Sequence, residues 1–172
     1  MEPAATSEPG RDGRFRIRPF RAEDALPLRA LYYRAVQEGA ARFYDQRQRD
    51  AWARAPEMPP DWRDRLGREI TLVAEDARGP VGFMTLGHDG HLDLAFVAPE
   101  AMGTGIAAAL HDRLLVEAEA RGIAHLTTEA SHLARRFFLR QGWREIAEQQ
   151  VDLGGVRLTN FRMEKRLGRG PS

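Results

Sequence analysis

The sequence predicts an α/β fold in which helices flank a central, mostly antiparallel sheet of about seven strands. Hydrophobic runs of strand length alternate with runs of helical periodicity, and three of the strand-like runs follow one another through short turns. Strands joined by short turns pair in antiparallel fashion, whereas a crossover of helical length joins parallel strands. One long helical run lies between two later strands, so the sequence indicates a mixed sheet with helices on its faces.

The first part of the chain predicts one short strand followed by helices. Residues Arg14–Arg18 alternate apolar and cationic side chains, as a strand does. Asp24 is a good N-cap for a helix that continues, with apolar residues at helical spacing, to Gly39. A weaker helix is expected at 45–54 and a further helical turn at 62–68, with a proline-rich loop between them.

The second part predicts the remaining strands and two more helices. An antiparallel meander is expected from the strand-like runs at 70–75, 81–86 and 91–97. A helix at 105–121 has one apolar stripe and ends before Gly122. The remaining elements are a strand at 126–129, a helix at 133–141, and two strands at 143–151 and 156–163.

Length and composition predict one domain. The chain has 172 residues, too few for two domains of ordinary size, and its mixture of 42% hydrophobic and 30% charged residues is typical of a soluble globular protein. Both ends have turn-forming residues and no periodicity. We therefore expect a disordered leader at 1–13, a single domain at 14–167 and a flexible tail at 168–172.

The composition also excludes several classes of protein and site. No run approaches 18 apolar residues and the start lacks the apolar core of a secretory signal, so we expect a cytoplasmic protein without a membrane partner. With no cysteine, disulfides, thiolate metal sites and a cysteine nucleophile are excluded. The 26 basic and 25 acidic residues are interleaved, which does not favour a nucleic-acid partner. His88 and His91 lack a third ligand in register, so no metal is predicted.

The segment Val97–Leu110, with the sequence VAPEAMGTGIAAAL, combines features of an anion-binding turn. Gly103 and Gly105 can adopt positive φ, which lets backbone N–H groups turn toward a phosphate. The start of the following helix adds free N–H groups and its dipole. Glycines at such a turn also serve simply as turn residues, so the loop alone leaves both interpretations open. It lacks the Gly-Lys-Ser/Thr of a P-loop and the third glycine of a dinucleotide-binding turn.

The same loop resembles motif A of the GNAT superfamily of acetyl-CoA-dependent N-acetyltransferases, whose core is Gln/Arg-x-x-Gly-x-Gly/Ala. The end of that motif matches at Gly105, Ile106 and Ala107, and Gly103 stands at a position that is commonly glycine. Met102 occupies the opening Gln/Arg position, which is a departure from the pattern. This departure removes one polar side-chain contact and predicts weaker anchoring by the loop.

Other segments extend the resemblance in the same order. The segment from Ser131 to Trp143 is similar to the family's Asn-x-x-Ala-x-x-Phe-Tyr-x-x-x-Gly-Phe, with Phe138 at the tyrosine position. Residues 17–19 resemble the family's opening strand, and 160–167 resemble its closing strand. The resemblance implies a GNAT-like acyl-CoA N-acyltransferase fold and acetyl-CoA as co-substrate. The implied coenzyme-binding residues are Phe96, Val97, Met102, Gly103, Thr104, Gly105, Ile106, Ala107, Ser131 and Phe138.

The resemblance assigns these residues different contacts. The loop would hold the pyrophosphate, with the Thr104 hydroxyl added to the backbone donors. The backbone of Phe96 and Val97 and the hydroxyl of Ser131 would bind the pantetheine arm. The family often uses a tyrosine at the position of Phe138 to protonate the departing thiolate, and that acid is absent. Water or unassisted departure is the favoured replacement, with another side chain or the helix dipole as alternatives.

His91 and Asp93 are the candidate catalytic residues on the acceptor side. They lie two residues apart on the strand before the loop, and simple alternation places both on one face with Ala95 and Val97. An imidazole can accept a proton from an ammonium directly or through water. The competing interpretation makes His91 an exposed histidine beside a turn and Asp93 a structural hydrogen-bond acceptor.

Some aromatic and arginine side chains have two interpretations. Core packing is expected first for Tyr32, Tyr33, Tyr44 and Trp52, although they could line an amine pocket. Arg135 and Arg136 could meet the 3′-phosphate of the coenzyme, but an arginine-rich chain makes that placement unspecific.

The predicted function is an N-acetyltransferase that moves an acetyl group from acetyl-CoA to a primary amine of a small molecule or peptide. The alternatives are an acyltransferase that uses a longer acyl-CoA and a non-catalytic acyl-CoA-binding sensor or interaction module. A homodimer through the closing strands is compatible with the resemblance. The sequence selects neither the amine nor the oligomeric state.

Overall fold

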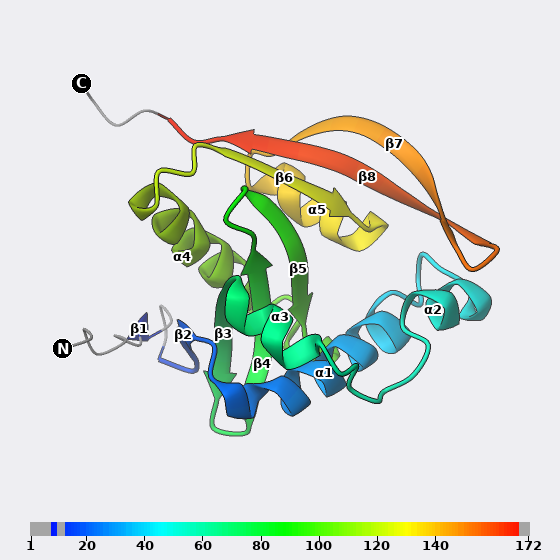
Figure 1. Ribbon diagram of the computed structural model, residues 1–172, viewed down its shortest axis with the longest axis horizontal. Helices are drawn as coiled ribbons and strands as arrows, with labels where there is room; N and C mark the ends of the chain where they lie inside the picture. Colours follow the sequence, from blue (N-terminus) through cyan, green and yellow to red (C-terminus); the bar gives the residue numbers. More distant parts are fainter. Residues whose placement is uncertain (1–7, 10–12, 169–172) are drawn as a thin grey trace.

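The computed structural model describes residues 8–9 and 13–168 (Figure 1). These residues form one sheet of eight strands in the order β1-β2-β3-β4-β5-β6-β8-β7. Neighbouring strands are antiparallel except β5 and β6, which are parallel. The predicted mixed, mostly antiparallel sheet is confirmed, with the two-residue β1 added to the seven longer strands.

The predicted order of helices and strands is also confirmed. The strands are β1 (Glu8–Pro9), β2 (Arg16–Pro19), β3 (Ile70–Asp76), β4 (Gly79–Leu86), β5 (His91–Val97), β6 (His125–Ala130), β7 (Arg144–Leu153) and β8 (Val156–Arg166). The helices are α1 (Ala25–Arg34), α2 (Gln46–Trp52), α3 (Trp62–Arg68), α4 (Ile106–Ala120) and α5 (His132–Arg140). Short 3₁₀ turns at 22–24 and 99–101 and a π-helical turn at 35–39 complete the list.

The N-terminal leader contains one element that composition did not predict. Glu8 and Pro9 form β1 by pairing with Ile17 and Arg16 of β2. Within the predicted leader, these two residues thus have strand pairing. Residues 1–7 and 10–12 of the predicted leader, and 169–172 of the predicted tail, lie outside the described residues.

Asp24 does not have the predicted role of capping α1 with its side chain. Its carboxylate accepts hydrogen bonds of 2.7 and 2.8 Å from the buried guanidinium of Arg18 and one of 2.8 Å from the N–H of Arg21. Burial opposes the ionisation of Asp24, but these hydrogen bonds hold its pKa below the usual value. Arg18 also pairs with Glu75 of β3 at 2.9 Å. A buried cation binds a carboxylate more strongly than a neutral helix N–H does, so the ion pair with Arg18 replaces the cap on α1.

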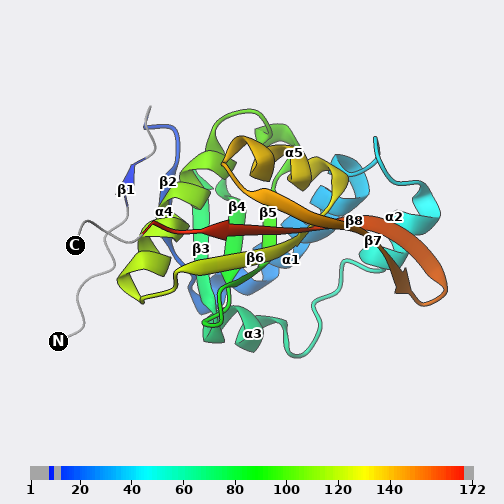
Figure 2. The same cartoon turned by 90° about the horizontal axis from the view of Figure 1, so that it is seen from above.

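Helices cover both faces of the sheet. Phe83 of β4 packs against Trp62 of α3 with ring centroids 6.2 Å apart, and Tyr32 of α1 lies 5.7 Å from the same indole. The neighbouring Gly82 faces the opposite way, because a Cβ on it would lie 3.2 Å from Leu110 of α4. Successive residues of a strand face opposite sides, so α1 and α3 cover one face and α4 covers the other. In Figure 2, α3 and α5 lie on opposite sides of the strands.

The parallel pair β5 and β6 is joined at one end only. His91 pairs with Thr127 and Leu92 with Thr128, and no later residues of these strands are partners. Figure 1 shows β5 curving away from β6 beyond this point. The sheet therefore opens between its two halves, on the carboxyl-terminal side of the pairing. No helix in the described residues has the length and apolar character needed to cross a bilayer.

Candidate functional site

Two cavities meet where β5 and β6 diverge. The loop cavity, about 340 Å³, extends toward residues 101–108 at the start of α4. The hairpin cavity, about 350 Å³, extends toward α2 and the hairpin of β7 and β8. Both are lined by Trp52, Ala95, Phe96, Ser131, Ala134 and Phe138. A ligand group in one cavity therefore lies next to a ligand group in the other.

Backbone conformation explains the two glycines of the loop. Gly103 and Gly105 have φ angles of 77° and 87°, in the left-handed region, and a Cβ on either would meet nothing within 4 Å. Glycine is thus required for the conformation rather than for space inside the protein. Gly105 is the N-cap of α4, and no side chain caps the helix there. The first N–H groups of α4, at Ile106 and Ala107, have no helical acceptor and favour an anion.

Most of the predicted coenzyme residues line the loop cavity; they are Phe96, Val97, Met102, Gly103, Gly105, Ile106, Ala107, Ser131 and Phe138. Thr104 does not line it, because its hydroxyl donates a hydrogen bond to the carbonyl of Ala101 within the loop. Met102 is 39% exposed, and its sulfur lies 3.6 Å from the position of a Cβ on Gly39. The loop therefore offers backbone donors, with no polar side chain directed into the cavity from 102 or 104.

Successive residues at the end of β5 contribute different groups to the site, either a side chain or the backbone. The N–H of Ala98 donates to the carbonyl of Val81 on β4 at 2.8 Å. Backbone groups alternate in direction along a strand, so those of Phe96 also point toward β4 and those of Val97 point toward the opening. Phe96 instead contributes its ring, which lies 4.8 Å from Tyr32. The predicted backbone role therefore suits Val97 better than Phe96.

Ser131 and Phe138 lie on the far side of the junction from β5. The Ser131 hydroxyl oxygen accepts a hydrogen bond of 3.2 Å from the N–H of Ala134 and thereby caps α5, which leaves its own hydrogen for another acceptor. Phe138 is 1% exposed and its ring lies 4.8 Å from that of Trp143. The tyrosine position of the family motif thus holds an apolar wall here, without a proton donor.

His91 and Asp93 both line the hairpin cavity. Nδ1 of His91 lies 2.9 Å from the hydroxyl of Thr127, which holds the imidazole against β6. Asp93 forms an ion pair with Arg65 of α3. The structure therefore brings the two candidates to one cavity and gives Asp93 a structural partner, as the competing interpretation expects.

The predicted shared face of Asp93 with Ala95 and Val97 is wrong. Ala95 and Val97 pair with Met84 and Gly82, and Gly82 faces α4. Asp93 reaches α3 on the opposite face and has no partner on β4, because the register shifts at that point. The bulge adds one residue to β5 and reverses the alternation on which the prediction depended.

Three of the four aromatic candidates line the hairpin cavity as well as packing against the core; they are Tyr32, Tyr44 and Trp52. The hydroxyl of Tyr32 donates to the carbonyl of Trp52 at 3.3 Å, and that of Tyr44 donates to the carbonyl of Thr159 at 2.7 Å. Burial raises the pKa of both phenols. Both stay neutral near neutral pH, so they supply polar surface without charge.

The arginine that lines the loop cavity is one that sequence reasoning missed. Arg135 is paired with Glu145, and the guanidinium of Arg136 lies 5.0 Å from the ring of Phe43. Arg140, at the end of α5, lines the loop cavity, and no other Lys or Arg of the described residues does so. The sequence around Arg140 does not predict that this side chain lines a cavity, because the cavity forms only when α5 packs beside α4.

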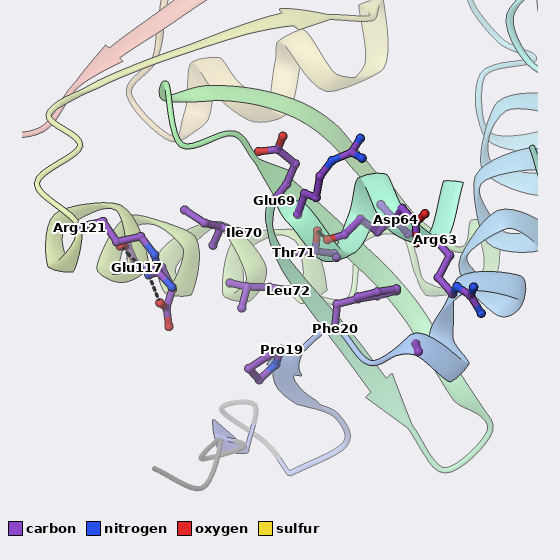
Figure 3. Close-up of a pocket in the computed structure, with 14 residues that line it drawn as sticks. Pro19, Phe20, Arg63, Asp64, Glu69, Ile70, Thr71, Leu72, Glu117 and Arg121 are labelled. Atoms are coloured by element: carbon purple, nitrogen blue, oxygen red, sulfur yellow. Dashed lines mark hydrogen bonds and ion pairs between the residues drawn. The ribbon is translucent and has the colours of Figure 1, made fainter. Parts of the chain in front are cut away.

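A larger cavity, about 720 Å³, lies away from this site (Figure 3). Figure 3 shows Arg63 and Asp64 on α3 at one side and the ion-paired Glu117 and Arg121 on α4 at the other, with Ile70 and Leu72 of β3 between them. None of the predicted site residues lines it. Across residues 13–168, no three His, Asp or Glu side chains gather as a metal-binding group.

Known proteins are similar to this chain in sequence and in fold. The model of the acetyltransferase (GNAT) domain matches residues 34–165. An N-acetyltransferase of Escherichia coli strain K12 named YafP, described as uncharacterized, is 34% identical over 147 residues, which cover 86% of this chain and 93% of that protein.

Solved structures agree with the sequence matches. A GCN5-related N-acetyltransferase of Rhodopseudomonas palustris has a TM-score of 0.83 and 30% identity, with 97% of this chain and 100% of that chain covered. The PaiA N-acetyltransferase of Thermoplasma acidophilum, solved with coenzyme A, has a TM-score of 0.70 and 18% identity, with 88% and 98% covered. The fold inferred from the sequence motifs is confirmed, and the chain belongs to the GNAT family of N-acetyltransferases.

Proposed function

We propose that this protein transfers the acetyl group of acetyl-CoA to a primary amine by direct attack of the amine on the thioester. The observation that carries the proposal is the meeting of the two cavities at the divergence of β5 and β6. One cavity leads to a glycine loop and a free helix start, and the other contains a histidine and carboxylates. The PaiA N-acetyltransferase, which shares this fold, was solved in complex with coenzyme A, and this supports coenzyme A as the ligand.

The loop would hold the pyrophosphate. The free N–H groups at the start of α4 and the positive φ of Gly103 and Gly105 favour an anion at this place. Arg140 adds a cationic side chain along the same cavity. Because the donors are mostly backbone groups, the binding tolerates methionine at position 102.

The pantetheine arm would follow the opening between β5 and β6. Val97 directs its backbone N–H and carbonyl away from β4 and toward this opening, and the Ser131 hydroxyl keeps a free hydrogen on the other side. This path places the thioester beside Ala95 and Phe138, where the two cavities join. The acyl carbon then faces the hairpin cavity.

The transfer would consist of one substitution at the acyl carbon. The acceptor arrives as an ammonium, and His91 would first accept one proton from it directly or through water. The amine nitrogen then forms a bond to the acyl carbon and the carbon–sulfur bond breaks. The sulfur leaves as a thiolate and takes up, through water, the second proton that the nitrogen loses as the amide forms. Thr127 would orient the imidazole through Nδ1 and leave Nε2 for this task.

A matched pair of glycine variants tests the coenzyme assignment. Gly105 and Gly122 lie at opposite ends of α4, both have positive φ, and a Cβ on either meets nothing within 4 Å. Gly105→Trp should abolish the binding of acetyl-CoA in titration calorimetry, whereas Gly122→Trp, with similar backbone strain, should retain it. Equal binding by the two variants would refute the assignment. Binding of acetyl-CoA by the wild type without thiol release on any amine would instead favour a sensor.

A further inference from the structure

We infer that the acceptor is a small amine bearing an aromatic or branched apolar group, and that Glu129 attracts its ammonium ion. The inference rests on the proposed function and concerns the hairpin cavity alone. Three independent features carry it: the apolar walls, the small volume and the charge of the lining.

The walls of the hairpin cavity are mostly aromatic and aliphatic. Rings come from α1, α2, β5 and the segment before α2, in addition to Phe138 of α5, and aliphatic side chains come from both strands of the hairpin. These residues are Tyr32, Tyr44, Trp52, Phe96, Val151, Leu153 and Leu158. Burying an apolar group of the acceptor against them is favourable, and a fully polar amine gains nothing from these surfaces.

The hairpin cavity is small and is bordered toward α2 by part of a second hydrophobic cluster. Tyr44, Leu158 and Ala40 are its buried members. The hydroxyl of Tyr44 donates to the carbonyl of Thr159 at 2.7 Å, and the amide of Gln48 donates to the carbonyl of Arg157 at 3.1 Å. These contacts hold the hairpin against α2, and the remaining volume of about 350 Å³ is at the low end for ligand pockets. The space suits a small molecule rather than a peptide chain.

The charged lining of the hairpin cavity favours a cation. Asp93 and Glu129 are its carboxylates, and no Lys or Arg of the described residues lines it. Asp93 is already paired with Arg65. Glu129 is exposed and has no hydrogen bond or ion pair within the described part of the chain, so its charge is available to a ligand. An amine that also bears a carboxylate would be repelled.

The position of Glu129 relates it to the reaction site. His91 pairs with Thr127, and Asp93 and Glu129 each follow two residues later on their strands. The divergence of β5 and β6 therefore begins between the two carboxylates. An ammonium drawn toward Glu129 enters beside His91, the group that would take its proton.

The experiment measures binding and turnover separately. With the enzyme saturated with coenzyme A, 2-phenylethylamine should change the tryptophan fluorescence saturably, and Trp52→Phe should remove that change. With acetyl-CoA, thiol release should give a kcat/KM for 2-phenylethylamine about tenfold or more above the values for phenylalanine, spermidine and a tetrapeptide, because an unmatched polar or charged group loses at least that factor. Glu129→Gln should raise the KM for 2-phenylethylamine about fivefold, the effect of one exposed charge, whereas Glu119→Gln on the exposed side of α4 should not change it.

The outcomes separate this inference from the proposed function. Failure of the wild type to bind acetyl-CoA would contradict the proposed function. Binding of acetyl-CoA with equal or better turnover of spermidine, phenylalanine or the tetrapeptide would overturn the inference and leave the proposed function standing. A Glu129→Gln variant with unchanged KM would overturn the role of Glu129.

Discussion

The indole N–H of Trp143 donates a hydrogen bond of 2.9 Å to Nε2 of His111, in the buried space where α4 meets α5. His111 is 1% exposed, and the rings of Phe137 and Phe138 pack against it with centroids 5.8 and 6.4 Å away. Because Nε2 accepts this bond, the imidazole is neutral with its hydrogen on Nδ1. The pair joins α4, the helix that begins at the glycine loop, to the segment that directly follows α5.

The His111–Trp143 bond predicts a loss of stability in mild acid. Burial lowers the pKa of His111, against the opposing influence of the Asp112 carboxylate. The unfolded chain therefore takes up a proton first, and the stabilisation is lost as the pH falls below about 6.5. Between about pH 7 and pH 5, the free energy of unfolding measured in urea should fall less for His111→Gln than for the wild type. Equal losses would show that His111 does not titrate on unfolding.

The contacts of Glu164 predict a second loss of stability, at more acidic pH. On β8, it pairs with Arg144 of β7 and accepts a hydrogen bond of 2.8 Å from Nε2 of His125 on β6. These two partners lower its pKa to about 2. The carboxylate thus stabilises the fold fully above its ordinary value of 4.5 and progressively less as the pH falls toward about 2. Glu164→Gln should unfold at lower urea than the wild type at neutral pH, with a difference that shrinks below about pH 4; a constant difference would contradict this.

The position of Arg140 predicts that its side chain contributes to the affinity for the coenzyme. It lies along the loop cavity, whereas Arg136, one turn earlier on α5, lies over Phe43. Arg140→Ala should weaken acetyl-CoA binding about two- to fivefold, as expected for one exposed charge pair, and more salt should reduce the difference. Arg136→Ala is the matched control and should leave the dissociation constant unchanged. Calorimetry at two salt concentrations makes the comparison, and equal effects of the two changes would remove Arg140 from the site.

Substitutions of His91 and Asp93 should have different kinetic effects. Loss of a general base commonly costs about a hundredfold or more, so His91→Ala should lower kcat by that order and alter the acid limb of the pH–rate profile. Asp93→Asn breaks an ion pair with Arg65 and should lower kcat far less. Acetyl-CoA affinity, measured in parallel, should be unchanged in both variants. An unchanged pH–rate profile for His91→Ala would exclude His91 as the base.

Local patterns were sufficient for the sheet and for the glycine loop. The meander of β3, β4 and β5 follows from alternating runs and short turns, and the parallel pairing of β5 with β6 follows from the length of the crossover through α4. Gly103 and Gly105 are informative because few other residues adopt their φ angles. Such signals depend on neighbours in the chain, so they can be identified without the fold.

Only the tertiary structure determined which side chains line the cavity for the acceptor. The bulge at Asp93 reverses a face that strict alternation predicts. Tyr44 reaches Thr159 across more than half of the chain, and Glu129 meets the cavity only because β6 leaves β5. The sequence alone determined which backbone forms the loop and the sheet, because those choices are local. Which side chains face one another across the opening depended on contacts between residues far apart in the chain, and no local periodicity encodes them.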